Sequence, residues 1–399
     1  TKKGQRGTGP QVDVDLSFGL AQAYRGYDDF LILDPLQYFQ VEKARYENAG
    51  QDLPASLLAI YGDPNNPTIP DYIYAEPSTV TGTDQWGRVI VDESRYSYPN
   101  ALIMPGSRGT NWWDEVFGVG ETFDANVSVR GGGQNERYSV GFSYFDQSGT
   151  AIGNRFQRGT VRVNTDFNRG RFTVGENLTI ALEQAHGGIG GDNFGEGSII
   201  GKNILSQPVI PVYDIAGNWA SGKAPGLGNN TNPVREAQLG PDRPNRNTRI
   251  FGNVFGRMDL LEGLWANTSV GLNAGEGSSR GWTPIRPEDS EPSLSNSFNE
   301  SNNYFTNWTI TNTLNLQRTF AEQHNVSVIA GHEAIRSRSR SIGASMANLV
   351  TTDPNARYIQ PALGDPASRN VTSSGGVSAL HSWFGKIDYH YGGRYYLRG

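Results

Sequence analysis

The chain has 399 residues, of which only 36% are hydrophobic, while 50 are glycine and 11% are aromatic. A soluble chain of this length would hold two or three domains with large cores, but this composition offers little apolar material for them. The net charge of −6 comes without a basic run, so nucleic acid is not an expected partner. The absence of cysteine excludes disulfides and thiolate metal sites. No stretch approaches the roughly 20 apolar residues of a spanning helix, which leaves only a β-barrel as a membrane fold.

Apolar and polar residues first alternate in the segment QVDVDLSFGL, residues 11–20, which predicts a strand. Residues 122–149 contain two such runs around a glycine-rich turn, which predicts a hairpin. Further hairpins are predicted at 161–182, 249–274, 304–333 and 380–397. We expect about eleven strands in total.

The predicted connections alternate between short turns and long polar loops. The short turns lie at 131–136, 168–171, 261–263, 320–323 and 392–393. The long loops are expected at 21–120, 184–248, 275–303 and 334–379, and one modest loop at 146–158. Outer-membrane β-barrels sort their connections in this way, with short periplasmic turns and long extracellular loops. We therefore predict an all-β fold, a transmembrane antiparallel barrel whose strands turn apolar residues to lipid and polar residues to the lumen.

Aromatic residues near the predicted strand ends fit the two interfacial girdles of a membrane barrel. They are Trp112, Trp113, Trp308, Trp383, Tyr389 and Tyr391. The alternative is that aromatic residues simply favour strand ends and hairpin packing.

Other aromatic residues in the long loops could stack on sugar rings. These candidate substrate-binding residues are Trp86, Trp219, Trp282, Tyr72, Tyr74 and Tyr213. Tyr61 lies in the same predicted loop as Tyr72 and Tyr74 and belongs to the same group. The alternative is that they anchor the loops against one another or against a partner protein.

We expect no catalytic residue, no cofactor and no metal ion, and hence a protein that is not an enzyme. Residues 277–281 match the G-x-S-x-G pattern of a nucleophile elbow, but they open a proline-containing loop instead of leading into a helix. The five histidines lack the spacing of HExxH. Asp192 and Glu196 could ligate calcium, although their stretch lacks the register of an EF-hand loop and a solvated acidic loop explains it.

Several segments resemble the SusC/RagA family of TonB-dependent outer-membrane transporters. The start TKKG is similar to the TTKKG that ends the family's plug domain, and NWWDEVF at 111–117 is similar to its NWYDEVF. The hairpin at 128–149 and the segments 156–164, 324–333 and 383–397 resemble family strands. Residues 35–48, with a proline start and a glycine stop, predict a helix in the first long loop, where the family also has one.

The resemblance implies a 22-stranded barrel with a plug folded inside it, opened by TonB and closed outside by a SusD-like lipoprotein. It also implies import of an oligosaccharide or an oligopeptide, that is, of glycans or peptides. The barrel would contact the lipids of the outer membrane. Eleven strands cannot close such a barrel. We therefore expect residues 1–10 to be the end of the plug and its tether, and residues 11–399 the N-terminal half of the barrel, in a longer protein whose TonB-binding segment lies outside this chain. The alternatives are a single-component siderophore or vitamin receptor, and a soluble secreted β-rich glycan-binding protein or adhesin.

Overall fold

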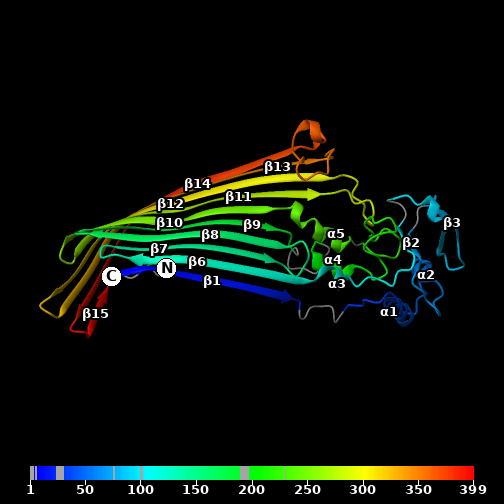
Figure 1. Ribbon diagram of the computed structural model, residues 1–399, viewed down its shortest axis with the longest axis horizontal. Coiled ribbons are helices and arrows are strands. Elements are labelled where there is room, and N and C mark those ends of the chain that lie inside the picture. Colours follow the sequence, from blue (N-terminus) through cyan, green and yellow to red (C-terminus); the bar gives the residue numbers. More distant parts are fainter. Residues whose placement is uncertain are drawn as a thin grey trace.

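A large antiparallel sheet dominates the computed structural model, which describes residues 4, 7–23, 31–74, 77–98, 102–188, 197–229 and 231–399. Its strands follow one another in chain order, and its first strand pairs with the sixth of the chain (Figure 1). The eleven strands of the sheet are β1 (Thr8–Gln22), β6 (Val119–Gly132), β7 (Glu136–Ser148), β8 (Arg155–Arg169), β9 (Phe172–His186), β10 (Asn245–Leu261), β11 (Leu264–Thr283), β12 (Ser297–Phe320), β13 (His324–Ala347), β14 (Asn370–Tyr391) and β15 (Tyr395–Arg398). The predicted all-β class and strand number are thus confirmed.

The remaining elements lie between these strands and are short. The helices are α1 (Pro35–Asn48), α2 (Ala55–Tyr61), α3 (Trp112–Val116), α4 (Ile199–Leu205) and α5 (Pro233–Gln238), with 3-10 turns η2 (Glu93–Arg95), η3 (Gly240–Asp242), η4 (Pro361–Leu363) and η5 (Pro366–Ser368). Two small ribbons pair β2 (Tyr72–Tyr74) with β5 (Leu102–Ile103) and β3 (Val80–Thr83) with β4 (Val89–Val91). Helix α1 has the predicted bounds, and the Asp34 carboxylate caps it by accepting a hydrogen bond from the Gln37 N–H at 2.8 Å. None of the described helices has the length and apolar character needed to span a bilayer.

The connections are sorted between the two ends of the sheet. Short turns join the strands at one end, and the helices and small ribbons gather at the other (Figure 1). The turn between β10 and β11 shows why glycine is needed at this end. Gly263 has a φ of +77°, and a Cβ placed on it would lie 2.3 Å from the carbonyl oxygen of Gln317. Glycine thus lets this turn pack against β12.

The strands β11 to β14 extend into the regions predicted as loops, 275–303 and 334–379. Strand β11 runs to Thr283 and β12 begins at Ser297, while β13 runs to Ala347 and β14 begins at Asn370. These loop boundaries were wrong because the extensions are mostly polar, with few apolar residues such as Trp282, Phe298 and Met346, and so lack the regular alternation of apolar and polar residues used to recognise a strand. Backbone ladders hold them together, helped by polar cross-strand pairs such as Arg280 with Glu300 at 2.9 Å. With 24 residues, β13 is about 80 Å long, far more than a bilayer requires.

The two faces of the sheet differ in chemistry. One face, which we call the apolar face, carries Val127, Phe142, Val161 and Ile180 side by side in direct register. In β1 the residues Val12, Val14, Leu16, Phe18 and Leu20 are all more than 60% exposed. So large an exposed apolar surface is unsuited to water and has the chemistry of a lipid-facing wall.

Residues on opposite faces of β6 should respond differently to a buried charge. Val127 lies on the apolar face, and its neighbour Asn126 lies on the other face. We expect Val127→Arg to destabilise the barrel of the full-length protein by about 2–4 kcal/mol near the bilayer midplane, and Asn126→Arg to cost far less. The measurement is urea unfolding of the protein in lipid vesicles. Equal losses at both positions would show that the faces are assigned wrongly.

Candidate functional site

The face opposite the apolar face, which we call the polar face, carries a row of amide side chains across three strands. Asn164 of β8 lies opposite Asn177 of β9, which lies opposite Asn253 of β10. The row continues through Gly271 of β11 to Thr309 of β12. Because paired residues in an antiparallel ladder share a face, the register alone places these groups in line.

Hydrogen bonds link the amide row and hold its side chains in place. The Asn177 amide donates to the Asn253 oxygen at 3.2 Å, and the Asn253 amide donates to the Ser269 hydroxyl at 3.1 Å. The row lines a hollow of about 540 Å³ together with Asn273 and Asn307. Amides and hydroxyls both donate and accept hydrogen bonds, so this wall can bind the amide groups of a peptide or the hydroxyl groups of a sugar.

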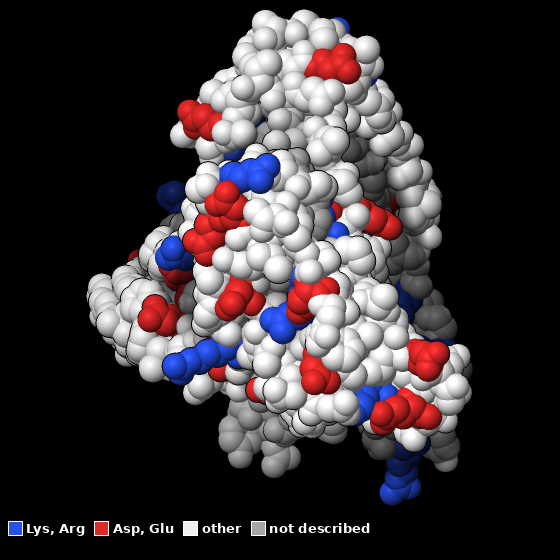
Figure 2. Space-filling model, turned by 90° about the vertical axis from the view of Figure 1, so that its right-hand side faces the viewer, with Lys and Arg blue, Asp and Glu red and all other residues white. Residues whose placement is uncertain are grey.

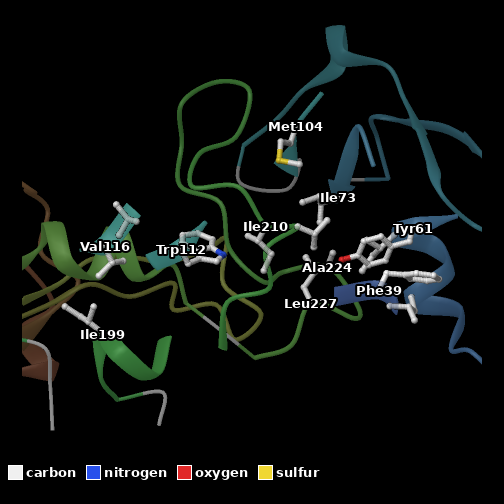
Figure 3. Close-up of a cluster of buried hydrophobic side chains, with 14 of the residues drawn as sticks. Phe39, Tyr61, Ile73, Met104, Trp112, Val116, Ile199, Ile210, Ala224 and Leu227 are labelled. Carbon is white, nitrogen blue, oxygen red and sulfur yellow. The ribbon is translucent and has the colours of Figure 1, made fainter. Parts of the chain in front are cut away.

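The two longest loops pack together over one end of the sheet. We call the described residues of 31–118 and 197–244 the cap. Its apolar core draws on both loops (Figure 3), and its buried members are Phe39, Leu57, Ile60, Tyr61, Ile73, Met104, Trp112, Val116, Ile199, Val209, Ile210, Ala224, Leu227, Val234 and Ala237. Burial of this set gives the two loops a common hydrophobic core, so they form one folded unit.

Trp112 lies at the junction of the two loops of the cap. Its indole N–H donates to the Gln207 carbonyl at 3.0 Å, and its own carbonyl accepts from the Asn203 amide at 2.5 Å. Beside it a cavity of about 500 Å³ is lined by Tyr38, Thr110 and several residues of 203–208. The cap therefore contains a partly apolar cavity with polar groups at its edge, as ligand sites do.

A buried group of charges fastens the loop 284–296 to the cap. The Arg235 guanidinium of α5 donates to Glu288 and, at 3.0 Å, to Asp289, and all three side chains are almost fully buried. The Tyr98 hydroxyl also donates to Glu288, at 3.2 Å, from the other loop of the cap. Because a buried charge without its partner is costly, this cluster holds three segments in one arrangement.

Two tyrosines of the cap are kept protonated by their surroundings. Burial raises the pKa of Tyr96 to about 12, helped by its hydrogen bond to the Asp214 carboxylate. Burial, with Glu288 nearby, also raises the pKa of Tyr98 well above its usual range. An unfolded chain loses tyrosine protons near pH 10, so the contribution of Tyr96 to stability is complete below that pH and is lost as the pH rises through about 12.

The structure disperses the aromatic residues proposed to bind substrate. Tyr213 and Trp219 are in ring contact at 4.7 Å, the only such pair among these candidates in the described part of the chain. Trp86 is half-buried between β3 and β4, and the Tyr72 hydroxyl donates to Glu93 at 2.7 Å. The side chain of Tyr74 lies outside the described residues.

Two of the loop aromatics are buried and do not offer a free ring. Trp282 is 3% exposed, and the Arg357 guanidinium covers its ring at 4.0 Å. Tyr61 is fully buried in the core of the cap. These two residues therefore anchor the loops, which is the alternative to substrate binding considered above.

The proposed girdle residues divide into two groups. Trp308, Trp383, Tyr389 and Tyr391 lie on the apolar face of β12 and β14, and Trp383 is 83% exposed. Trp112 is only 2% exposed within the cap. Trp113 in α3 stacks on Phe117, the residue that follows this helix. Trp112 therefore cannot contact lipid, because it is enclosed by the two loops.

Two further sequence motifs remain, the G-x-S-x-G pattern at 277–281 and the acidic pair Asp192 and Glu196. Residues 277–281 lie inside β11, where the Ser279 hydroxyl shares a hydrogen bond with that of Ser301 at 2.7 Å. A nucleophile elbow needs a strand-to-helix turn, which this is not. Asp192 and Glu196 lie outside the described residues.

Sequence reasoning missed three arginines on the apolar face of β13. Arg336, Arg338 and Arg340 alternate with serines and are all exposed. Their period of two was a readable signal, but it was assigned to the loop 334–379. Viewed from the cap end, basic and acidic side chains are mostly scattered in small mixed groups (Figure 2).

The charge cluster predicts the response of the cap to one substitution. Arg235→Met removes the guanidinium shared by Glu288 and Asp289, which leaves Glu288 with the Tyr98 hydroxyl and Asp289 with Arg286 at 3.7 Å. Loss of one partner from a buried ion pair costs about 3–5 kcal/mol. We expect faster amide hydrogen exchange in 231–244 and 284–296 and unchanged exchange in β6 to β9. Arg45→Met in α1, which removes an exposed pair with Glu42, is the control and should change neither region. Unaltered exchange in Arg235→Met would contradict the role given to the cluster.

Comparison with known proteins supports the resemblance found in the sequence. The chain is 23% identical over 311 residues to TonB-dependent receptor P3 of Formosa agariphila, covering 75% of this chain and 30% of the relative. It is 24% identical over 264 residues to TonB-dependent receptor SusC of Bacteroides thetaiotaomicron, covering 56% of this chain and 26% of the relative. The chain thus spans less than a third of these relatives. No protein-family model matches it.

Solved structures with the same fold match the entire chain. The RagAB peptide importer superposes with a TM-score of 0.74 in its open-open state and 0.72 in its closed-closed state, at 18% and 17% identity. Each match covers 100% of this chain and 42% of the other. Together with the sequence relatives, this confirms the resemblance to SusC and RagA and places the strands in the outer membrane. In sequence and in fold, the chain is similar to the TonB-dependent outer-membrane transporters of the SusC/RagA type.

Proposed function

We propose that this chain forms part of the wall and the extracellular cap of a TonB-dependent importer of oligomeric nutrients. The observation that carries the proposal is the pairing of an exposed apolar face with a polar face that bears a linked amide row. Such a wall separates lipid from a water-filled passage. The relatives are receptors and importers by name, which agrees with a role in transport and not in catalysis.

The chemistry of the polar face favours a cargo rich in hydrogen-bonding groups. Asn164, Asn177 and Asn253 present neutral amides in a row, with the Thr309 hydroxyl on the same line. Neutral donors and acceptors suit an oligosaccharide or an oligopeptide, since both repeat uncharged polar groups along their length. The RagAB structures are of a peptide importer, and the cargo of the present protein is proposed only as belonging to these two classes.

A SusD-like lipoprotein is the proposed partner of the cap. Apolar side chains are exposed in the cap and the adjoining loop, among them Ile90 in β4, Ile215 and Leu294. Leu294 is 76% exposed. We propose that a lid over the mouth covers these residues, because apolar side chains gain free energy when an interface removes them from water.

The residues before β1 are proposed to be the end of the plug and its tether. The wall strand β1 begins at Thr8, three residues earlier than the expected start at residue 11. The Gly4 N–H donates to the Tyr138 carbonyl at 3.3 Å, and a Cβ on Gly4 would lie 2.3 Å from the Gly131 oxygen. Only glycine permits this approach to the β6–β7 hairpin. A tether fixed here would let TonB, acting through a segment outside this chain, remodel the plug without moving the wall.

Uptake by cells that carry the full-length protein tests the proposed function. We expect import of a fluorescent oligosaccharide or oligopeptide to require TonB, and the paired change Asn177→Ala with Asn253→Ala to lower the uptake rate several-fold by removing the linked amides. The matched control is Asn312→Ala, which removes an amide from the apolar face, where Asn312 accepts a hydrogen bond from Thr268 at 2.9 Å. Uptake that persists without TonB would refute the importer, and uptake of a ferric siderophore alone would favour the single-component receptor.

The β3–β4 ribbon offers a test of the partner that spares the core of the cap. The ribbon projects from the cap (Figure 1), whereas the nearby Ile73 and Met104 belong to the core and must stay. Replacing residues 82–90 by a short glycine linker should weaken binding of the lipoprotein, measured by co-purification of the two proteins, and leave the barrel folded. Val41→Asp, on the exposed face of α1, serves as a control for altered surface charge. A complex of unchanged stability would exclude the ribbon as a contact.

A further inference from the structure

We propose that Arg336, Arg338 and Arg340 form a binding site for the phosphate groups of a lipid in the outer leaflet of the membrane. The three residues follow one another at alternate positions of β13 and therefore share one face. That face is the apolar face, because the register runs from Arg338 to Thr306 and Ala274, then to Ile250 and Ile180. The arginines thus project outward, away from the polar face.

The arginines begin where the apolar surface of β13 ends. Below them on the same face lie Val326, Val328, Ala330, His332 and Ala334. In the same order, their partners are Arg318, Leu316, Leu314, Asn312 and Ile310 of β12 and Tyr389, Ile387, Gly385, Trp383 and His381 of β14. A stretch of nine residues is about 30 Å long, and a strand tilted by about 40° carries it across an apolar band of about 25 Å. Arg336 is the next outward residue and therefore lies at the level of the lipid head groups.

The position of Trp308 supports this level. Trp308 lies directly opposite Arg336 on the same face, and tryptophan in membrane barrels marks the boundary between hydrocarbon and head groups. The helices of the cap lie toward the same end of the sheet as the upper ends of these strands (Figure 1). The boundary marked by Trp308 and Arg336 is therefore the extracellular one.

The three guanidinium groups have no protein partner. Among the described residues, none of them forms an ion pair or a side-chain hydrogen bond. The carboxylates on the same face are engaged elsewhere, since Glu300 pairs with Arg280 at 2.9 Å and Glu276 accepts from Asn302 at 2.8 Å. The strand on the other side contributes only Ala379, Val377 and Gly375 opposite the arginines. The patch is therefore positive and open.

Phosphate is the anion that this arrangement fits. Successive arginines are about 7 Å apart along the strand, so their like charges repel one another until an anion lies between them. Guanidinium groups bind phosphate oxygens through two parallel N–H donors. An outward patch beside lipid meets phosphate on a lipid head group, and the three arginines would hold this lipid beside β12 to β14.

Binding of diphosphoryl lipid A to the purified full-length protein in neutral detergent tests the site. We expect Arg336→Gln, Arg338→Gln and Arg340→Gln together to weaken binding by roughly 100-fold, since each basic residue near an anionic surface contributes about a fivefold factor. Arg338→Gln alone should weaken it about fivefold if the triple variant does not fold. The matched control exchanges three exposed arginines elsewhere, Arg95, Arg108 and Arg369, and should bind as the unaltered protein does.

Three further probes separate the possible origins of any binding. Lipid A stripped of phosphate should bind the unaltered and triple-variant proteins equally weakly, and inorganic phosphate at millimolar concentration should not displace intact lipid A. Equal affinity of the triple variant and the unaltered protein for intact lipid A would overturn the proposal. So would displacement by inorganic phosphate, which would indicate a site for free anions, or loss of lipoprotein binding in the triple variant with lipid A binding intact, which would indicate a protein interface.

Discussion

The requirement that every backbone N–H and C=O inside a membrane find a partner governs this structure. Within hydrocarbon an unpaired peptide group costs several kcal/mol, so strands can cross only as a continuous ladder. Ten neighbouring pairs, from β1–β6 to β14–β15, supply that ladder here. The ladder fixes which side chains share a face, and through that register it creates both the apolar face and the amide row of the polar face. The same ladder aligns the three arginines of β13 beside Trp308.

Much of the sheet could be predicted from the sequence, because strands of a membrane wall have one apolar and one polar face. The runs around Val127, Phe142 and Ile180 follow that rule, and glycine-containing turns separate several of them. Helix α1 was equally visible through its proline start and its glycine stop. The resemblance to the SusC/RagA family rested on segments within or next to these strands, and for this reason it agreed with the fold.

The upper parts of the molecule could not be predicted in the same way. Beyond Ala274 the strand β11 carries mostly glycine and polar residues, apart from Trp282, which pairs with Phe298 of β12. Most of its pairing with β12 therefore depends on backbone bonds that have no sequence signature. The core of the cap joins residues as distant as Phe39 and Val234, and no local pattern reports such contacts. The same holds for Arg235, whose partners Glu288 and Asp289 lie more than 50 positions away. The burial of Trp112, Trp282 and Tyr61 was not predictable for the same reason, because their local sequence does not report which distant segments cover them.

The central claim is that adjacent residues of one strand face lipid and water, and single cysteines introduced into this cysteine-free chain test it most directly. Phe142 and Ser143 of β7 are neighbours on opposite faces. With the full-length protein in vesicles, a fluorophore at position 142 should be quenched by brominated lipids and shielded from aqueous iodide. A fluorophore at position 143 should show the reverse. Similar quenching of both positions by lipid, or of both by iodide, would contradict the assignment of the two faces.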